Sequence, residues 1–256
     1  MESFLKKLIL YCYDKGLIPE FMIPSQFKRR LKSRGVFLNR EIKWFAEGYW
    51  AIQPMPNELE LNNYYENIYW DERGKAEGID TRDLDHFYLI RNLIPERLES
   101  PMVFLNFGAG HGGISHLMYL VGHRVINVEP SGLRLQYPEN WATVQSIDDV
   151  QERVDFVYGS HSLEHVHDIG KHLNKIRQIL RPGGYIFWEV PNGFAETLNG
   201  KKIKGRPPHT YYFTKEYFDQ LGFNKILNDS FTEGTFPYQP SRDEYGEVIR
   251  YLGKLI

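Results

Sequence analysis

The second half of the chain alternates short apolar runs with longer amphipathic stretches. Runs of this length joined by helical stretches are typical of successive βα units, so they predict a mostly parallel sheet. A helix expected over 172–180 ends at the Pro/Gly turn 181–184, and another is expected from Thr214 to Leu221. The predicted strands are 102–107, 125–128, 143–145, 154–158, 185–190 and 223–227.

The first part of the chain has a different pattern, which indicates helices and turns. Amphipathic spacing predicts helices near 2–13, 58–65 and 81–93, separated by proline- and glycine-containing turns. We therefore predict a helical N-terminal cap over residues 1–95 that covers the substrate, followed by an α/β domain over 96–256.

Composition restricts the class of protein. The chain has 256 residues, of which 42% are hydrophobic and 25% charged, which excludes wholesale disorder, a collagen-like repeat and a coiled-coil rod. A single cysteine, Cys12, excludes an internal disulfide framework and a multi-cysteine zinc site. The apolar run Leu8–Tyr13 is far shorter than the roughly 20 residues that cross a bilayer. We expect a cytoplasmic protein without a transmembrane segment.

Charge is divided unevenly along the chain. The total is −2, but residues 1–40 carry nine basic and three acidic side chains, a net +6, and the remainder carries −8. This balance, together with the absence of interleaved basic and aromatic residues, argues against nucleic acid as a partner. The basic stretch 26–34 is either a solvated helix face or a contact for a partner or an anionic membrane surface.

A glycine-rich turn is the most informative feature. The apolar run that ends at Phe107 leads directly into Gly108-Ala-Gly-His-Gly-Gly113 and then into a helical stretch. Glycines allow a sharp turn and a close approach of the backbone to a ligand, and the following helix N-terminus presents free N–H groups. Glu129 lies 21 residues beyond Gly108, at the end of the next strand, where a carboxylate can accept hydrogen bonds from ribose hydroxyls. The loop by itself fits either a dinucleotide or another ribose-bearing ligand.

Two downstream segments narrow the choice between a dinucleotide and another ribose-bearing ligand. Val154-Asp-Phe-Val-Tyr-Gly-Ser-His-Ser-Leu-Glu-His-Val166 is followed by Leu180-Arg-Pro-Gly-Gly-Tyr-Ile-Phe-Trp-Glu-Val-Pro-Asn192. Together with the glycine turn they resemble the motifs of class I S-adenosylmethionine-dependent methyltransferases, over about residues 86–228. The resemblance implies a Rossmann-like, seven-stranded, mostly parallel sheet with helices on both faces and S-adenosyl-L-methionine as the cofactor.

The resemblance also implies roles for individual residues. One position departs from the family pattern: Asn106 stands where an acid usually precedes the loop, so a water-mediated contact with the methionine ammonium loses a charge. The cofactor-binding residues expected beside methionine are Asn106, Gly108, Ala109, Gly110 and Gly112; Glu129 is expected at the ribose, Ser146, Ile147 and Asp148 at the adenine, and Ser160 below the sulfonium.

Histidines near the fourth strand are the candidates for catalysis. Methyl transfer requires a base that removes the proton of the acceptor, and histidine is suited to this near neutral pH. We expect this role for His161, His165 or His209. His161-x-x-Glu164-His165 also resembles the Glu-x-x-Glu-His metal site of some methyltransferases, although the first ligand differs, so a divalent ion and a bracing role for Glu164 remain alternatives.

Residues outside these motifs indicate the acceptor. Four cations over 201–206, among them Lys204 and Arg206, would complement a phosphate or carboxylate. Tyr64, Tyr65 and Tyr211 are further candidates for contact with the substrate. The sequence thus predicts O-methylation of a small, anionic or sugar-type acceptor, for example in cell-surface polysaccharide modification. The alternatives are a nicotinamide-dependent oxidoreductase or epimerase and a non-catalytic, methyltransferase-like subunit; the oligomeric state is undetermined.

Overall fold

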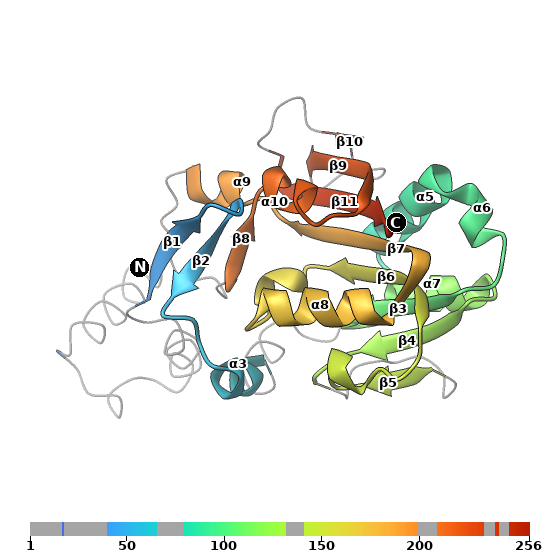
Figure 1. Ribbon diagram of the computed structural model, residues 1–256, viewed down its shortest axis with the longest axis horizontal. Coiled ribbons are helices and arrows are strands. Elements are labelled where there is room, and N and C mark those ends of the chain that lie inside the picture. Colours follow the sequence, from blue (N-terminus) through green and yellow to red (C-terminus); the bar gives the residue numbers. More distant parts are fainter. Residues whose placement is uncertain are drawn as a thin grey trace, which may run out of the picture.

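The molecule is an α/β protein built on one large sheet (Figure 1). The computed structural model describes residues 17, 40–65, 79–131, 141–198, 209–232, 239–240 and 246–256. The sheet has the strand order β10-β9-β11-β7-β6-β3-β4-β5. Its strands are β3 (Val103–Phe107), β4 (Arg124–Val128), β5 (Ala142–Val144), β6 (Val154–Ser160), β7 (Leu180–Pro191), β9 (Asn224–Thr232), β10 (Gln239–Pro240) and β11 (Val248–Lys254).

Parallel pairing dominates this sheet. The strands β5, β4, β3, β6 and β7 pair in parallel, whereas β11 is antiparallel to both of its neighbours, β7 and β9. The predicted seven-stranded, mostly parallel sheet is confirmed, and the two-residue β10 extends it beyond β9. The loops that follow β3, β4 and β6 consequently leave the sheet at the same edge.

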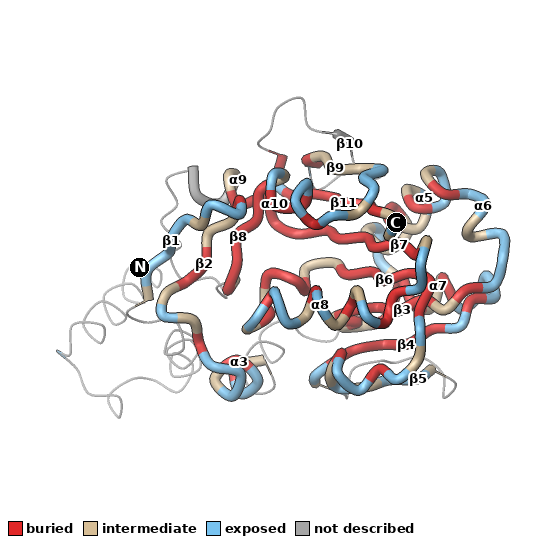
Figure 2. The backbone as a smooth tube through the Cα atoms, in the orientation of Figure 1, coloured by how far each residue is buried: buried red, intermediate tan, exposed pale blue. Residues whose placement is uncertain are grey.

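Helices cover both faces of the sheet. Alternate side chains of a strand point to opposite faces, so Phe104 joins one apolar cluster and Leu105 the other. The Phe104 cluster includes residues of α5 (Thr81–Leu93) and α7 (Gly113–Leu120), and the Leu105 cluster includes α8 (Ile169–Ile179) and α10 (Lys215–Asp219). Figure 2 shows the central strands buried between these layers. The remaining helices are α3 (Glu58–Tyr64), α6 (Pro95–Leu98), α9 (Gly193–Leu198), η3 (Ile147–Asp149) and η4 (Leu163–His165).

The N-terminal part corrects one prediction. Residues 41–53 form a hairpin of β1 (Glu41–Phe45) and β2 (Tyr49–Gln53) instead of helices and turns, and β2 also pairs with β8 (Tyr211–Phe213). Trp44 and Trp50 lie opposite each other in the hairpin, with ring centroids 4.5 Å apart. Aromatic pairs of this kind stabilise neighbouring antiparallel strands, which favours the hairpin over a helix here. The predicted helix at 2–13 and the basic stretch 26–34 lie outside the described residues.

Local capping explains why α5 is found over the residues predicted. Asp80 precedes the helix, and its side chain accepts a hydrogen bond from the Asp83 backbone N–H, while the Asp83 side chain accepts one from the N–H of Asp80. This reciprocal capping box begins the helix at Thr81.

Within the described residues, no helix is long and apolar enough to span a bilayer.

The strand β11 has a buried cation at its centre. Arg250 is 1% exposed; its Nε donates to Glu189 Oε2 at 2.7 Å and its Nη1 lies 2.6 Å from Asp85 Oδ2. A charge interrupts the apolar run 248–252, which explains why the pattern alone did not predict this strand. Two carboxylates compensate the guanidinium, so the strand can occupy the middle of the sheet.

Replacing Arg250 tests this compensation. Arg250→Met leaves Glu189 and Asp85 buried without their cation, and we expect a loss of about 3–5 kcal/mol in the free energy of unfolding. The matched control is Arg124→Met, which removes an exposed ion pair with Glu152 and should cost less than about 1 kcal/mol. Urea unfolding of the two variants gives both numbers. Equal losses would contradict the account.

Candidate functional site

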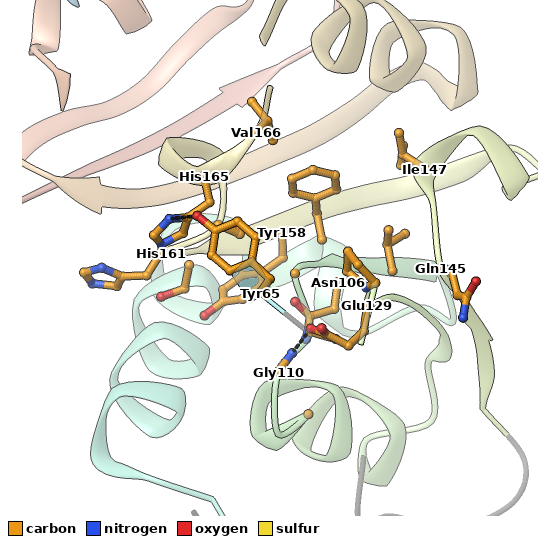
Figure 3. A pocket seen from close by; sticks show the side chains of 18 of the residues that line it. Tyr65, Asn106, Gly110, Glu129, Gln145, Ile147, Tyr158, His161, His165 and Val166 are labelled. Atoms are coloured by element: carbon orange, nitrogen blue, oxygen red, sulfur yellow. Dashed lines mark hydrogen bonds between the residues drawn. The ribbon is translucent and has the colours of Figure 1, made fainter. Parts of the chain in front are cut away.

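A cavity of about 520 Å³ lies at the carboxyl ends of β3, β4 and β6 (Figure 3). The glycine loop after β3 and Glu129 after β4 line one part of it. His161 and His165, which follow β6, and Tyr65, at the end of α3, line another part. The topology thus brings to one place residues from four segments that are distant in sequence.

The glycine loop has a backbone that favours glycine. Gly108, Gly110 and Gly112 have φ angles of 70°, 53° and 74°, in the left-handed region. A Cβ at Gly108 would also collide with the Cβ of Ser162. Gly112 is the residue before α7, whose N-terminus faces the cavity through Gly113 and Ile114. The loop therefore forms a close cradle for a ligand, as the sequence predicts.

Glu129 closes this cradle from the neighbouring strand. It is 4% exposed, and its carboxylate accepts hydrogen bonds from the Gly110 N–H at 2.8 Å and from the N–H and hydroxyl of Ser131 at 3.1 and 2.7 Å. Oε1 accepts both bonds from Ser131, whereas Oε2 accepts one bond and keeps a further lone pair for a ligand hydroxyl. The arrangement fits the ribose contact predicted for this residue.

Asn106, at the end of β3, is part of a neutral polar chain in the interior. Its Nδ2 donates to the Ser115 hydroxyl at 2.8 Å, which donates to Asn127 Oδ1 at 2.7 Å. Asn106 lines the cavity but is only 2% exposed. The site therefore has a neutral amide at the position where the resemblance leads us to expect an acid.

The segment predicted to hold adenine is only partly at the cavity. Ser146 and Ile147 line it, whereas Asp148 is exposed and forms an ion pair with Lys171 at 2.8 Å. Its place is taken by Gln145 and Asp149, which the sequence reasoning missed. Both directly flank the predicted triplet, and the adenine contact of this segment stays a prediction.

His161 has an unusual setting between two acids. Its φ angle is 48°, a left-handed conformation that is uncommon for a residue other than glycine. Its Nδ1 lies 3.4 Å from Glu164 Oε1, and its Nε2 lies 3.4 Å from Glu189 Oε1. The ring lines the cavity next to Ser160 and is 22% exposed. Carboxylates on both sides stabilise the positive charge that the ring acquires when it takes a proton.

A hydrogen-bonded pair lies beside His161. The Tyr65 hydroxyl and His165 Nδ1 are 2.7 Å apart and share a hydrogen bond, and both residues line the cavity. The His209 ring lies 5.0 Å from that of His165. Of the three predicted catalytic histidines, His161 and His165 thus line the cavity (Figure 3), whereas His209 contacts His165 and is not a lining residue.

Glu164 is the acid of this cluster. Burial opposes its charge, but His165, His161 and His209 outweigh burial and lower the pKa of Glu164 to about 2. Ligand atoms of Glu164, His165 and His209 lie within 4.8 Å of one another, so these side chains could hold a metal ion. This set shares Glu164 and His165 with the predicted metal site and has His209 in place of His161.

The predicted acceptor-binding residues lie in different places, some at the cavity and some in the interior. Tyr65 lines the cavity, whereas Tyr64 is 1% exposed and packs inward. Tyr211 is 6% exposed and donates to the carbonyl of His167 at 3.1 Å, within the core. Lys204 and Arg206 lie outside the described residues.

The first turn of α5 contributes two residues that the sequence reasoning missed. Arg82 and Asp83 both line the cavity. The Nε atom of Arg82 lies 3.4 Å from Glu189 Oε1. Burial and the neighbouring Asp80 raise the pKa of Asp83 to about 6. The sequence held one signal, an acid pair at the start of a helix, but that pattern also occurs wherever a helix is capped.

An open, mostly parallel sheet with a glycine cradle after one strand and an acid after the next defines a site for a ribose-bearing ligand. A family model described as "Methyltransferase domain" matches residues 81–227, more than half of the chain. The protein therefore belongs to this family and is an S-adenosylmethionine-dependent methyltransferase. The cradle at Gly108 and the carboxylate of Glu129 fit this cosubstrate, and the assignment replaces the nicotinamide alternative.

Named relatives share the family at low identity. The chain is 26% identical over 186 residues to the ubiquinone biosynthesis O-methyltransferase of Bradyrhizobium sp. (strain ORS 278), covering 62% of this chain and 74% of the relative. It is 24% identical over 234 residues to the enzyme of the same name from Ruegeria pomeroyi, covering 77% and 94%.

Solved structures agree with the fold. Magnesium protoporphyrin IX methyltransferase from Synechocystis matches with a TM-score of 0.54 at 11% identity, over 78% of this chain and 100% of that one. The 1,6-didemethyltoxoflavin-N1-methyltransferase of Burkholderia thailandensis matches with a TM-score of 0.53 at 20% identity, over 84% and 99%. At these identities the likeness shows the fold alone.

A glycine substitution tests the cradle. Gly108→Ala places a methyl group against Ser162 and strains a left-handed backbone, so we expect the affinity for S-adenosylhomocysteine to fall at least about tenfold. Gly122→Ala is the matched control, because Gly122 has a φ of 93° but open space around it and lies outside the cavity lining. Calorimetric titration should show unchanged affinity there. A similar loss in both variants would attribute the effect to backbone strain alone.

Proposed function

We propose that the protein transfers a methyl group to a hydroxyl of a small, anionic molecule bound between Tyr65, His161 and His165. One observation supports this proposal most directly: a single cavity contains both the glycine loop with Glu129 and these three side chains. A cosubstrate in the loop and an acceptor beside the histidines would share that cavity, which lets them react by proximity.

The chemistry requires one proton transfer by the protein. When bound, S-adenosylmethionine supplies a methyl group on a sulfonium sulfur, and S-adenosylhomocysteine is the product after the carbon–sulfur bond breaks with its electron pair on sulfur. The acceptor oxygen forms the new bond to carbon and loses its proton. His161, with its ring in the neutral form, is placed to take that proton, and Glu164 and Glu189 then stabilise the resulting imidazolium.

Tyr65 and His165 are placed to orient the acceptor. The Tyr65 hydroxyl and the His165 ring share a hydrogen bond, both line the cavity, and a phenol oxygen can accept a hydrogen bond from an acceptor hydroxyl. Arg82 is a described cation in the lining and can attract a carboxylate or phosphate on the acceptor. The contribution of Lys204 and Arg206 to this anionic subsite stays a prediction.

The two sequence relatives from Bradyrhizobium and Ruegeria favour oxygen as the methylated atom, because both are named O-methyltransferases. Their names concern ubiquinone biosynthesis, and at this identity we take from them only the class of acceptor atom. A sugar-type acceptor, a role in polysaccharide modification and a cytoplasmic location stay predictions from the sequence.

A divalent ion at Glu164, His165 and His209 is a second proposal for the same end of the cavity. The Glu164 carboxylate is buried, and nitrogen atoms of His161 and His165 lie 3.4 and 3.7 Å from its Oε1. Nitrogen and oxygen donors in this combination suit several divalent metals. An ion there would polarise an acceptor hydroxyl and lower the pKa of that hydroxyl.

Binding and turnover test the main proposal together. We expect calorimetric heat with S-adenosylhomocysteine and none with NADH, and methyl transfer to members of a panel of hydroxylated aromatic acids and sugar phosphates. His161→Gln should lower kcat about 100-fold without changing the affinity for S-adenosylhomocysteine. Tyr119→Phe, on the far side of α7, is the control and should change neither. Binding without transfer to any acceptor would favour the non-catalytic alternative.

Chelation separates the metal proposal from simple acid–base catalysis. If Glu164, His165 and His209 hold an ion, EDTA should abolish transfer, and Mg²⁺ or Mn²⁺ should restore it. Glu164→Gln should then require a higher metal concentration for half-maximal activity. Full activity after chelation, with no metal detected by mass spectrometry, would contradict the proposal and leave Glu164 as a partner of His161.

A further inference from the structure

The Asp83 carboxylate lies directly against the glycine loop. A Cβ at Gly113 would collide with Asp83 Oδ2, so the absence of a side chain at Gly113 makes room for the carboxylate. The backbone N–H of Ile114, in the first turn of α7, donates to the same carboxylate. Asp83 thus joins the first turns of α5 and α7 at the edge of the cavity.

The other cavity-lining acids are placed differently. Glu129 binds the loop from β4, and Asp149 lies in η3 beside the predicted adenine segment. Glu58 is on α3, the helix that ends at the histidine side, and Asp80 caps α5. Asp83 is therefore the described acid that contacts the α7 end of the loop.

Among the described acids of the lining, the one beside Asp83 at this end of the cavity is Asp80, whose carboxylate caps α5. Asn106, labelled in Figure 3, is neutral, and its amide nitrogen donates to the Ser115 hydroxyl inside the protein. The methionine part of the cosubstrate carries an ammonium group at physiological pH, and burying it next to neutral groups would cost free energy. A carboxylate near the loop would offset this cost with a charge-assisted hydrogen bond.

We propose that Asp83, from α5, binds the α-ammonium group of S-adenosylmethionine and takes over the charge that Asn106 does not provide. This inference rests on the S-adenosylmethionine-binding part of the proposed function. It assigns to the first turn of α5 a ligand-binding role in addition to its capping role. It also explains why residue 113 is glycine although its φ angle does not require one: a side chain there would displace the Asp83 carboxylate.

The electrostatics of Asp83 agree with a cationic ligand. Burial and Asp80 raise the pKa of Asp83 to about 6, which means that its charge is disfavoured without a ligand. An ammonium group beside the carboxylate stabilises the charged form and so opposes both causes. The positive ammonium group of the ligand thus pairs with the negative Asp83 carboxylate, whose charge the protein itself does not neutralise fully.

Capping by Asp83 must be separated from ligand binding. Asp83 accepts from the Asp80 N–H at 3.1 Å, and this bond needs an acceptor oxygen but no charge. Asp83→Asn keeps an oxygen acceptor and the same shape, so it preserves much of the cap and removes the charge. Thermal unfolding of the variant shows whether the helix is intact.

Two ligands that differ only in the amine provide the test. S-adenosylhomocysteine carries the ammonium group, whereas 5′-deoxy-5′-(3-carboxypropylthio)adenosine lacks it and keeps the carboxylate, ribose and adenine. In calorimetric titrations, Asp83→Asn should weaken S-adenosylhomocysteine at least about tenfold and leave the deaminated analogue within about twofold of wild type. Gly113→Ala, which displaces the carboxylate without removing it, should shift the ratio of the two affinities in the same direction.

Asp168→Asn is the matched control, with the same loss of charge at an exposed residue that caps α8 and lies outside the cavity lining. It should leave the ratio of the two affinities unchanged. An equal weakening of both ligands by Asp83→Asn, or an equal change of the ratio in Asp168→Asn, would overturn the proposal. A wild-type protein that binds neither ligand would instead refute the proposed function itself.

Discussion

A fully buried carboxylate, that of Glu189, ties the sheet to the site. It accepts from Arg250 Nε at 2.7 Å and shares a hydrogen bond with His86 Nε2 at 2.7 Å, which connects β7 to β11 and α5. On its other oxygen, the Ser160 hydroxyl donates at 3.3 Å, and His161 lies at 3.4 Å. Burial alone would raise the pKa of Glu189, but hydrogen bonds from His86 and His161 and the Arg250 guanidinium hold that pKa well below the usual value. Removing a charge from such a network is costly because the partners stay buried.

This network explains why fold and chemistry are coupled. The same carboxylate that fixes α5 on the sheet lies against His161, and the backbone N–H of His161 donates to the Glu189 carbonyl at 2.9 Å. Because α5 is fixed, its first turn reaches the glycine loop, and Arg82 and Asp83 enter the cavity lining. A displaced α5 would therefore alter the cosubstrate end and the acceptor end of the cavity together.

The local parts of the site could be predicted from sequence, and the long-range parts could not. The glycine loop, Glu129 and the helix over 81–93 follow from short-range patterns, namely backbone freedom, strand–loop spacing and a capping box. The strand β11 was missed because its central Arg250 is compensated only by residues far away in the chain. Asp83 was missed for a similar reason, since its contact with Gly113 depends on how two helices pack.

The central claim is that one cavity binds the methyl donor and a small hydroxylated acceptor in contact with His161. The most direct measurement is mass spectrometry of the products formed from S-adenosylmethionine with a trideuterated methyl group and a small-molecule extract of the source cells. The account predicts a labelled methyl ether with the wild-type protein and about 100-fold slower formation of it with His161→Gln. A wild-type protein that binds S-adenosylhomocysteine yet labels no small molecule, or labels only nitrogen or carbon, would contradict it.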